Sequence, residues 1–522
     1  MVITRLAAAA IFVTMAVAPG PLMAAKWDDY IAAAEQAFEA GDYEKAETLY
    51  RRALNSAESV LGADHPDVSI VLNNIGALYR TLSRYDEAEA AYTRAVEIDR
   101  KALGKEHSEV AADYNNLARL YSVQGRYDEA EKLYLDALDI WSKRLGEFHQ
   151  NIAIVAVNLG ELYRRQGRYE KAEQMLLRAV EVDEEALGKG NPEVAIDLNN
   201  LGGLYREMGR YAEAETTYLR ALRIRETALG KSHPDVASSL NNLGQLFEDL
   251  GRFREAEDRY KRALEIWSAA WGEQHPDVAI ALNNLAELYR ITGRHDEAEP
   301  LYKRTIAIDV AVYGPDHPEV AIDVGNLAGL YEDQERFDEA EPLFQRALAI
   351  RKKAYGPVHP VVASSLNSLA RLYRSLGRYD EAEPLYRSAI EVWQESLGDD
   401  HPYLAIGLIN LANLYQTLDR FDEAEVLYLR AIAVDERAYG PDHPEVATDI
   451  TNLAWMYKNL GRYEQAEELF QRALKIREAT FGEAHPDVAE SLEDYAELMR
   501  ETGRSIEAQR LQSRAEEIRA NL

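Results

Sequence analysis

The chain has 522 residues, which is too many for one hydrophobic core, so several domains or an array of repeats is expected. Its net charge of −31 would repel a phosphate backbone, and the absence of cysteine excludes disulfides, thiol catalysis and cysteine-ligated metals. With 47% hydrophobic and 29% charged residues, the composition predicts a folded rather than a disordered chain.

The first 25 residues differ from the rest and have the three-part layout of a secretory signal peptide. Arg5 provides a positive start, residues 6–18 form an uncharged apolar run, and residues 22–25 offer small side chains for cleavage. The apolar run is shorter than the roughly 20 residues of a membrane-spanning helix, although an uncleaved anchor or a misassigned start site is the alternative. We therefore predict a signal peptide over residues 1–25 and an exported protein, either periplasmic or secreted.

From residue 26 onward the sequence repeats every 42 residues. His-Pro occurs at positions 65, 233, 275, 317, 359, 401, 443 and 485, and every gap is 42 or a multiple of it. The remaining slots hold His107-Ser108, His149-Gln150 and Asn191-Pro192. This periodicity predicts one repeat array over residues 26–522. Its units begin near 26, 65, 107, 149, 191, 233, 275, 317, 359, 401, 443 and 485.

Each unit has the pattern of two helices joined by a tight turn. In the second unit, Pro66 suits the first turn of a helix, and apolar residues then recur at three- and four-residue spacing. The positions of Ser83 and Arg84 hold Gly-Arg in most other units, often followed by tyrosine, and glycine there can take the left-handed conformation that ends a helix. A second apolar stripe follows at Ala88, Tyr92 and Ala95. Two such helices cannot bury their apolar faces alone, so neighbouring units must stack.

This pattern resembles the tetratricopeptide repeat family, position by position through Ala88, Tyr92 and Ala95. The 42-residue length and the phrases Leu-Asn-Asn-Leu-Ala at 282–286 and Tyr-Asp-Glu-Ala-Glu at 379–383 are similar to the kinesin-light-chain type of this repeat. The resemblance covers residues 26–522. It implies an all-α, right-handed superhelical solenoid of about twelve helix–turn–helix repeats, in which the first helices line a concave groove.

A weaker period of three units overlies the first. Late in the second helices the sequence runs Trp141, Asp183, Arg225, then Trp267, Asp309, Arg351, then Trp393, Asp435, Arg477. The cycle fails before Trp141, where Asp99 occupies the slot expected to hold arginine. Duplication of a three-unit segment is one interpretation, and a partner gripped by a tryptophan in every third unit is the other.

The sequence holds no recognisable catalytic motif. The histidines occur one per unit, so the stacking keeps them at least a helix-packing distance of roughly 8–10 Å apart, which is too far for shared zinc coordination. Neither a phosphate-binding glycine loop nor a nucleophile elbow is found. We expect no enzyme activity, no cofactor and no metal site, and we expect the histidines to bond backbone groups where the first helices begin.

The candidate binding residues are asparagines and arginines of the first helices. Asparagine is unfavourable inside a helix unless its amide is used, so a row of asparagines could bond the backbone of an extended peptide, as in relatives, or tie one helix to the next. The arginines form a basic line that could bind acidic side chains, or they could pair with neighbouring carboxylates. The candidate groove residues are Asn199, Asn200, Asn241, Asn242, Asn283, Asn284, Arg164, Arg206, Arg290, Arg374 and Trp455.

These observations predict a scaffold that binds a protein or peptide partner, and no nucleic acid. The partner would be an extended segment with acidic and apolar side chains, held in the concave groove. One alternative is a self-assembling structural or spacer subunit of an envelope complex, which would form oligomers. If the chain is not exported, a cytoplasmic adaptor is the alternative.

Overall fold

The computed structural model describes residues 27–39 and 42–520, and the predicted signal peptide lies outside them. This part of the chain forms 24 α-helices and no strand, which confirms an all-α solenoid. None of these helices is long and apolar enough to cross a membrane.

The first six helix pairs are α1 (Trp27–Glu39) with α2 (Tyr43–Leu61), α3 (Pro66–Thr81) with α4 (Tyr85–Leu103), α5 (Ser108–Val123) with α6 (Tyr127–Leu145), α7 (Gln150–Arg165) with α8 (Tyr169–Leu187), α9 (Pro192–Glu207) with α10 (Tyr211–Leu229), and α11 (Pro234–Asp249) with α12 (Phe253–Trp271).

The second six pairs continue the same arrangement. They are α13 (Pro276–Ile291) with α14 (His295–Tyr313), α15 (Pro318–Asp333) with α16 (Phe337–Tyr355), α17 (Pro360–Ser375) with α18 (Tyr379–Leu397), α19 (Pro402–Thr417) with α20 (Phe421–Tyr439), α21 (Pro444–Asn459) with α22 (Tyr463–Phe481), and α23 (Pro486–Glu501) with α24 (Ser505–Ala520).

The residue before each of these first helices, from α3 onward, caps the helix, as expected for the histidines. The Nδ1 atom of His401 accepts a hydrogen bond from the backbone N–H of Tyr403 at 3.1 Å, and Pro402 occupies the first helical turn. Asn191 replaces histidine before α9 and accepts from the N–H of Glu193 at 2.9 Å through its side-chain oxygen. Histidine and asparagine are therefore equivalent as caps in this fold.

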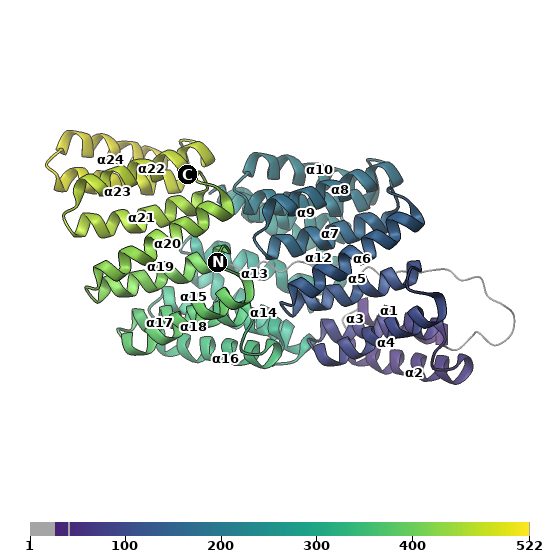
Figure 1. Ribbon diagram of the computed structural model, residues 1–522. Coiled ribbons are helices and arrows are strands. Elements are labelled where there is room, and N and C mark those ends of the chain that lie inside the picture. Colours follow the sequence, from purple (N-terminus) through teal and green to yellow (C-terminus); the bar gives the residue numbers. More distant parts are fainter. Residues whose placement is uncertain (1–26, 40–41, 521–522) are drawn as a thin grey trace.

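The twelve pairs wind into two superhelical turns that pack directly on each other. Nε2 of His401 lies 2.9 Å from the carbonyl oxygen of Arg165, 236 residues earlier in the chain. The histidines at 317, 359, 443 and 485 make the same contact with carbonyl groups 236 residues before them. With a 42-residue repeat, each pair of the second turn therefore lies on the pair six places earlier. In Figure 1 the first turn (α1–α12) lies to the right and the second turn (α13–α24) to the left.

Aromatic rings and prolines complete the contact between the turns. Tyr169 stacks on Tyr439 with ring centroids 5.3 Å apart, as the first residue of α8 meets the last residue of α20. Equivalent stacks join Tyr43 to Tyr313, Tyr85 to Tyr355 and Tyr211 to Phe481. The His-Pro segment lies so close to the turn glycine of the other pair that a Cβ on Gly251 would come within 2.7 Å of Pro486. Only glycine fits there.

The three-unit period of the sequence is a packing pattern between neighbouring pairs. The late residue of each second helix meets a residue 14 positions on, in the following first helix. Arg225 donates to Ser239 Oγ at 3.0 Å, and Arg351 and Arg477 repeat this bond to Ser365 and Ser491. Trp393 fills the space over Gly407, where an added Cβ would lie 2.9 Å from the indole ring. The identity of one residue therefore dictates the size and polarity of the other.

The tryptophans of this pattern are interior residues. Trp141, Trp267 and Trp393 are at most 2% exposed. The hypothesis that a partner grips a tryptophan in every third unit is therefore wrong, because no partner can reach these rings in the folded array. Packing between repeats accounts for the period.

Aspartate pairs form the third kind of contact between neighbouring helix pairs. Asp183 faces Asp197, and burial together with Asp183 raises the pKa of Asp197 to about 9, while burial raises that of Asp183 to about 6. Two buried carboxyl groups this close cannot both ionise without a large cost, so the pair keeps a proton at neutral pH. Asp435 and Asp449 form an equivalent pair, in which burial again raises both pKa values.

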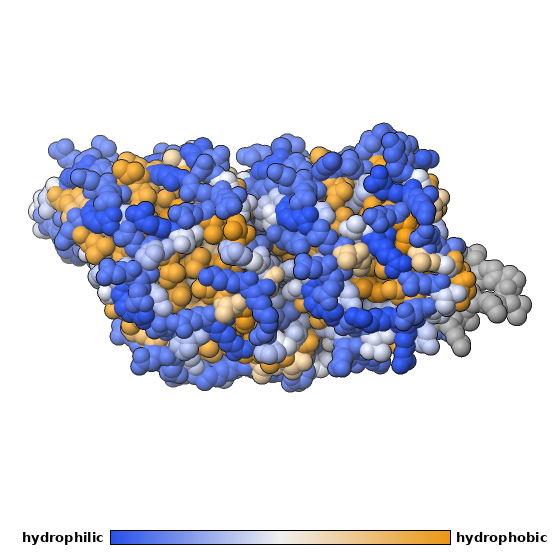
Figure 2. Space-filling view, turned by 60° about the horizontal axis from the view of Figure 1, so that its bottom comes forward, coloured by the Kyte–Doolittle hydropathy of each residue, from blue (hydrophilic) through white to orange (hydrophobic). Residues whose placement is uncertain are grey.

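Hydrophilic side chains cover most of the surface, and apolar side chains gather in patches between them (Figure 2). Most of the exposed large apolar residues fall on the outer faces of the second helices and on the two edges of the superhelix that no turn covers. They are Val60, Leu103, Leu135, Leu145, Phe148, Leu177, Leu219, Trp271, Ile291, Val358, Leu418, Val426, Leu429, Leu460, Tyr463 and Ile506.

Candidate partner-binding groove

The first helices of the pairs form the inner, concave wall of the superhelix. Neighbouring first helices, such as α7 and α9 or α17 and α19, approach each other more closely than neighbouring second helices do. Side chains that project from the first helices away from their own pair therefore line the groove. All candidate binding residues lie on first helices, from α7 for Arg164 to α21 for Trp455.

Several of the asparagine amides tie one first helix to the next. Nδ2 of Asn284 donates to Oδ1 of Asn241 at 2.8 Å, and Asn326 donates in the same way to Asn283 at 2.9 Å. Asn199 donates to Ser239 Oγ at 3.1 Å. The side chains of Asn199, Asn241, Asn283 and Asn284 are buried, whereas those of Asn200 and Asn242 are partly exposed. The buried asparagines therefore tie one first helix to the next, which is the structural alternative that the sequence left open.

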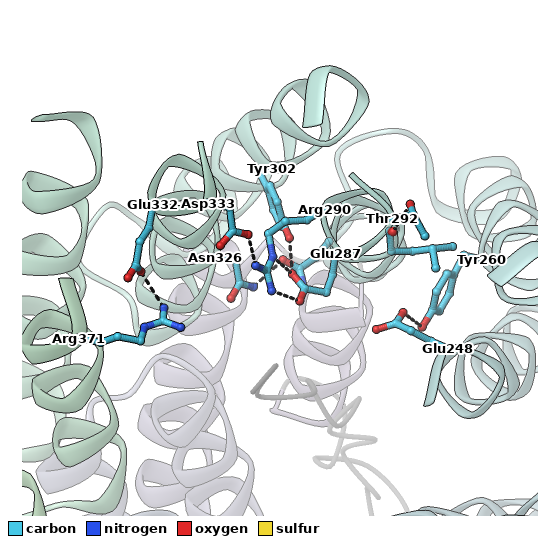
Figure 3. Close-up of polar contacts among 12 residues, drawn as sticks. Glu248, Tyr260, Glu287, Arg290, Thr292, Tyr302, Asn326, Glu332, Asp333 and Arg371 are labelled. Atoms are coloured by element: carbon cyan, nitrogen blue, oxygen red, sulfur yellow. Dashed lines mark hydrogen bonds and ion pairs between the residues drawn. The ribbon is translucent and has the colours of Figure 1, made fainter. Parts of the chain in front are cut away.

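Most candidate arginines pair with carboxylates of their own and the next first helix. Arg290 forms a salt bridge with Glu287 at 2.6 Å and another with Asp333, while Tyr302 donates to Glu287 at 2.6 Å (Figure 3). Arg164 pairs with Glu161 and Glu207, and Arg206 with Asp249. These networks connect successive pairs along the groove, so the arginines in them hold the wall together.

Three partly exposed groove arginines have no such partner. Within the described residues, Arg80, Arg119 and Arg374 form neither a salt bridge nor a side-chain hydrogen bond, and each is partly exposed. Burial, followed by the neighbouring Arg80, lowers the pKa of Arg119 to about 10. In a chain with a net charge of −31, arginines without a salt-bridge partner mark a local region of positive potential.

The opposite sector of the groove is acidic. Burial, with Asp249 and Glu287, raises the pKa of Glu248 to about 8, and Glu248 accepts a hydrogen bond from Tyr260 at 3.1 Å (Figure 3). Glu332 pairs with Arg371 at 2.8 Å on the neighbouring helix. The groove thus has cations at α3 and α5, an excess of carboxyl groups from α11 to α15, and a further free cation, Arg374, on α17.

Trp455 lies apart from the other candidates, near the end of the array. Its ring meets Phe470 edge-on at 5.9 Å, and Lys458 Nζ lies 4.3 Å from the ring centroid. Lys458 also pairs with Glu497 at 2.6 Å. Trp455 is partly exposed on the concave side, so it offers an aromatic surface beside a paired cation.

No metal centre is found among residues 27–39 and 42–520, where no three histidine or acidic side chains gather closely enough to hold an ion. The capping histidines are separated by whole repeats, and those at 317, 359, 401, 443 and 485 have both ring nitrogens engaged, as at His401.

Comparison with protein families identifies the repeat. The Tetratricopeptide repeat family matches residues 30–101, 108–185, 193–269, 277–353, 322–395, 362–437, 403–479 and 452–521, and a second family of the same description matches 157–228 and 241–309. The chain belongs to the tetratricopeptide repeat family. Comparison with curated proteins gives no match.

Among solved structures, this tetratricopeptide array is similar to kinesin-light-chain-like repeat proteins. A Podosopora anserina protein described as a kinesin light chain with nearly identical TPR-like repeats is 25% identical, with a TM-score of 0.34 over 39% of this chain and 97% of that one. BtubC (BKLC) from P. vanneervenii is 24% identical, with a TM-score of 0.35 over 47% and 91% of the two chains. A Rap protein complexed with competence and sporulation factor is 16% identical, with a TM-score of 0.45 over 80% and 99%.

The structure gathers the candidates of the tetratricopeptide array into two regions. The asparagines and Arg164, Arg206 and Arg290 lie together on α7 to α13, whereas Arg374 and Trp455 lie on α17 and α21. Their part in partner binding stays a prediction. Sequence reasoning missed Arg119, because its slot holds alanine, glycine, glutamate or glutamine in neighbouring units and shows no repeating signal.

Proposed function

We propose that this tetratricopeptide array is a non-enzymatic scaffold that holds an extended protein segment in its concave groove. Family membership supports the general role, since tetratricopeptide repeats mediate protein–protein contacts. An extended segment suits a continuous inner wall built from equivalent helices, because each repeat offers similar contacts to successive residues of the ligand.

One observation carries the proposed chemistry of the partner: on the groove side, Arg80, Arg119 and Arg374 form no salt bridge and no side-chain hydrogen bond within the described residues. A guanidinium group that is already paired gains little from a new carboxylate, whereas an unpaired one gains charge-assisted hydrogen bonds. We propose that these three arginines receive acidic side chains of the partner. Asn200, Asn242 and Trp455 would contact its backbone and apolar side chains.

The test is selection of random linear peptides against residues 26–522, followed by affinity measurement with variants. The groove variant is Arg119→Glu with Arg374→Glu. The matched control is Arg100→Glu with Arg223→Glu, which makes the same change of charge at exposed positions on second helices. Helicity is compared first, because only folded variants are informative.

We expect selected peptides to combine acidic with apolar residues, and the groove variant to bind them at least tenfold more weakly than the control does. Each lost charge-assisted bond corresponds to about 1.5–3 kcal/mol. Equal affinities of the two variants would place binding outside this part of the groove. Selection of basic peptides would contradict the proposed chemistry. Affinity capture from cell-envelope extract with the same pair of variants then identifies the natural partner.

We also propose that the protein is exported, on the strength of the apolar run and cleavage-site residues at its start. The measurement is the mass and N-terminal sequence of the protein isolated from its natural source. A chain that begins near residue 26 supports export. An intact chain in the cytoplasm contradicts it and favours the adaptor role.

A further inference from the structure

The two edges of the superhelix that no turn covers repeat the two sides of the contact between the turns. Inside the molecule, the edge of the first turn that carries the Gly-Arg-Tyr loops receives the His-Pro edge of the second turn. The second turn has its own Gly-Arg-Tyr edge and the first turn its own His-Pro edge, and no helix of residues 27–39 or 42–520 covers either of them. They face opposite ends of the molecule, at the left and right of Figure 1.

The free edge of the second turn keeps the features of a receiving surface. Its turn glycines, Gly377, Gly461 and Gly503, adopt positive φ and have open space where the equivalent glycines of the first turn meet His-Pro segments. The aromatic residues that begin its second helices, Phe337, Tyr379, Phe421 and Tyr463, correspond to those that stack between the turns, such as Tyr85 and Tyr169. The exposed Ile291, Leu418, Leu460 and Tyr463 lie on this edge.

The free edge of the first turn keeps the features of the surface that docks. His65, His107, His149 and His233 use Nδ1 to cap their helices, as His401 does. Within the described residues, the Nε2 atoms of these four histidines have no hydrogen-bond partner, whereas the equivalent atoms in the second turn bond to carbonyl groups. The exposed Leu103, Leu145, Phe148 and Trp271 lie on or beside this edge.

The two edges also match in register. In a continued superhelix, the first pair of a second copy would lie on the seventh pair of this chain, because each pair contacts the pair six places away. Leu103 would then cover Phe337, and Leu145 would cover Tyr379. Pro192 and Pro234 would cover Gly461 and Gly503, as Pro444 and Pro486 cover Gly209 and Gly251 inside the molecule.

The receiving edge is acidic, and the docking edge carries charges of both signs. Lys105, Lys189 and Lys231 occupy the docking edge of the first turn beside Asp64, Glu106 and Glu147, at the positions where the second turn has Pro357, Pro441 and Glu483. The receiving edge of the second turn carries Asp333, Glu335 and Asp419, at the positions where the first turn has Thr81, Ser83 and Gly167. Opposite charges on the two bare edges attract one another, although the chain as a whole is acidic.

We propose that the array associates end to end, with the His-Pro edge of one copy seated on the Gly-Arg-Tyr edge of the next. The contact is heterologous, since it joins two different surfaces, so both edges of an associated copy remain able to bind and the assembly grows as an open superhelical filament. This goes beyond the proposed binding of an extended partner and does not depend on it.

The test uses the purified full chain and three variants that change only exposed leucines. The docking-edge variant is Leu103→Glu with Leu145→Glu, and the receiving-edge variant is Leu418→Glu with Leu460→Glu. The control is Leu135→Glu with Leu177→Glu, on the outer faces of α6 and α8. Circular dichroism checks that all three keep the helix content of the parent chain, and sedimentation velocity then gives the distribution of mass against concentration.

We expect the parent chain and the control to form a series of multiples of the monomer mass as concentration rises, and salt to weaken this series. Each edge variant alone should remain monomeric. An equal mixture of the two edge variants should give dimers and nothing larger, because such a mixture contains only one competent pair of edges. A parent chain that is monomeric at all concentrations overturns the proposal, as does loss of association in the control or failure of the mixture to dimerise.

Discussion

The two superhelical turns use the same histidine in two different settings. In the first turn the side chains of His65 and His233 are 41% exposed, whereas in the second turn His401 is 5% exposed. Both settings use Nδ1 to cap a helix, and only the second uses Nε2 to bond the other turn. The motif is therefore a cap in every pair and a link only where a turn lies beneath it, so its repetition does not make its energetic role uniform.

The residues beside these histidines also differ between the two turns. The second helices of the first turn end in leucine at 103 and 145, and lysine follows at 105. In the second turn the equivalent helix end at 355 is tyrosine, which stacks on Tyr85, and proline stands at 357. Aromatic rings thus predominate at the helix ends where two turns meet, with Leu397 as the exception, and leucine predominates where the edge faces solvent, with Trp271 as the exception.

The prediction with the largest expected effect tests whether the difference between the two turns is confined to their edges. Trp141→Ala in the first turn and Trp393→Ala in the second each remove a fully buried ring between neighbouring pairs. We expect both to lower the free energy of unfolding by about 3–5 kcal/mol, because the layers are alike in both turns. Chemical denaturation followed by circular dichroism measures this. A loss in one turn only would mean that the interiors of the turns differ as well as the edges.

The second prediction separates the cap from the link. His359→Asn, His401→Asn and His443→Asn together keep a capping oxygen, as at Asn191, but remove the bonds to Val123, Arg165 and Glu207. We expect a loss of about 1 kcal/mol for each bond and a larger radius of gyration in X-ray scattering as the turns separate.

The matched control is His65→Asn, His107→Asn and His149→Asn in the first turn. These histidines only cap their helices, so stability should change by less than about 0.5 kcal/mol, with no change of shape. Equal effects of the two triple variants would show that the bonds between the turns add nothing to stability.

Acid should separate the turns through the same histidines. Burial lowers the pKa of His359, His401 and His443 to about 4, from an ordinary value near 6.5. The folded state therefore favours the neutral ring, and the resulting stability is complete above pH 6.5 and is lost as the pH falls toward 4. We expect the radius of gyration to rise across this range in the parent chain.

The triple variant His359→Asn, His401→Asn and His443→Asn should lack this acid transition, because it has no imidazole between the turns at those positions. Protonation of buried aspartates such as Asp183 stabilises the folded state in the same pH range. The radius of gyration, and not the melting temperature, therefore isolates the effect of the histidines. An unchanged acid expansion in the variant would assign it to other groups.

The smallest effect concerns two of the aspartate pairs, one from each turn. The pKa of Asp197 is raised to about 9, so the folded state favours its protonated form and loses stability as the pH rises toward 9. Asp197→Asn should therefore flatten the fall in melting temperature between pH 6 and pH 9, and Asp449→Asn in the second turn should do the same. Identical pH profiles for parent and variants would show that the pairs are not protonated in solution.

Local and nearest-neighbour features could be predicted from the sequence. The histidine caps, the glycine turns and the pairing of helices depend on residues within one repeat, and most of the twelve repeats show all three. The three-unit period was visible too, but its meaning was not, because the residue that faces Trp393 is a glycine and the one that faces Arg225 is a serine. Only the contact shows that the small residue belongs to the large one.

The sequence by itself determined the helix pairs, their caps and their family, because these follow from short-range periodicity and from the need of each amphipathic pair for a neighbour. Tertiary structure decided the rest. The number of pairs in a turn results from small rotations accumulated over six repeats, and no single repeat carries that information. This winding brings His401 to Arg165 and leaves His65 at a solvent-facing edge. It also separates the paired arginines of the groove from Arg80, Arg119 and Arg374.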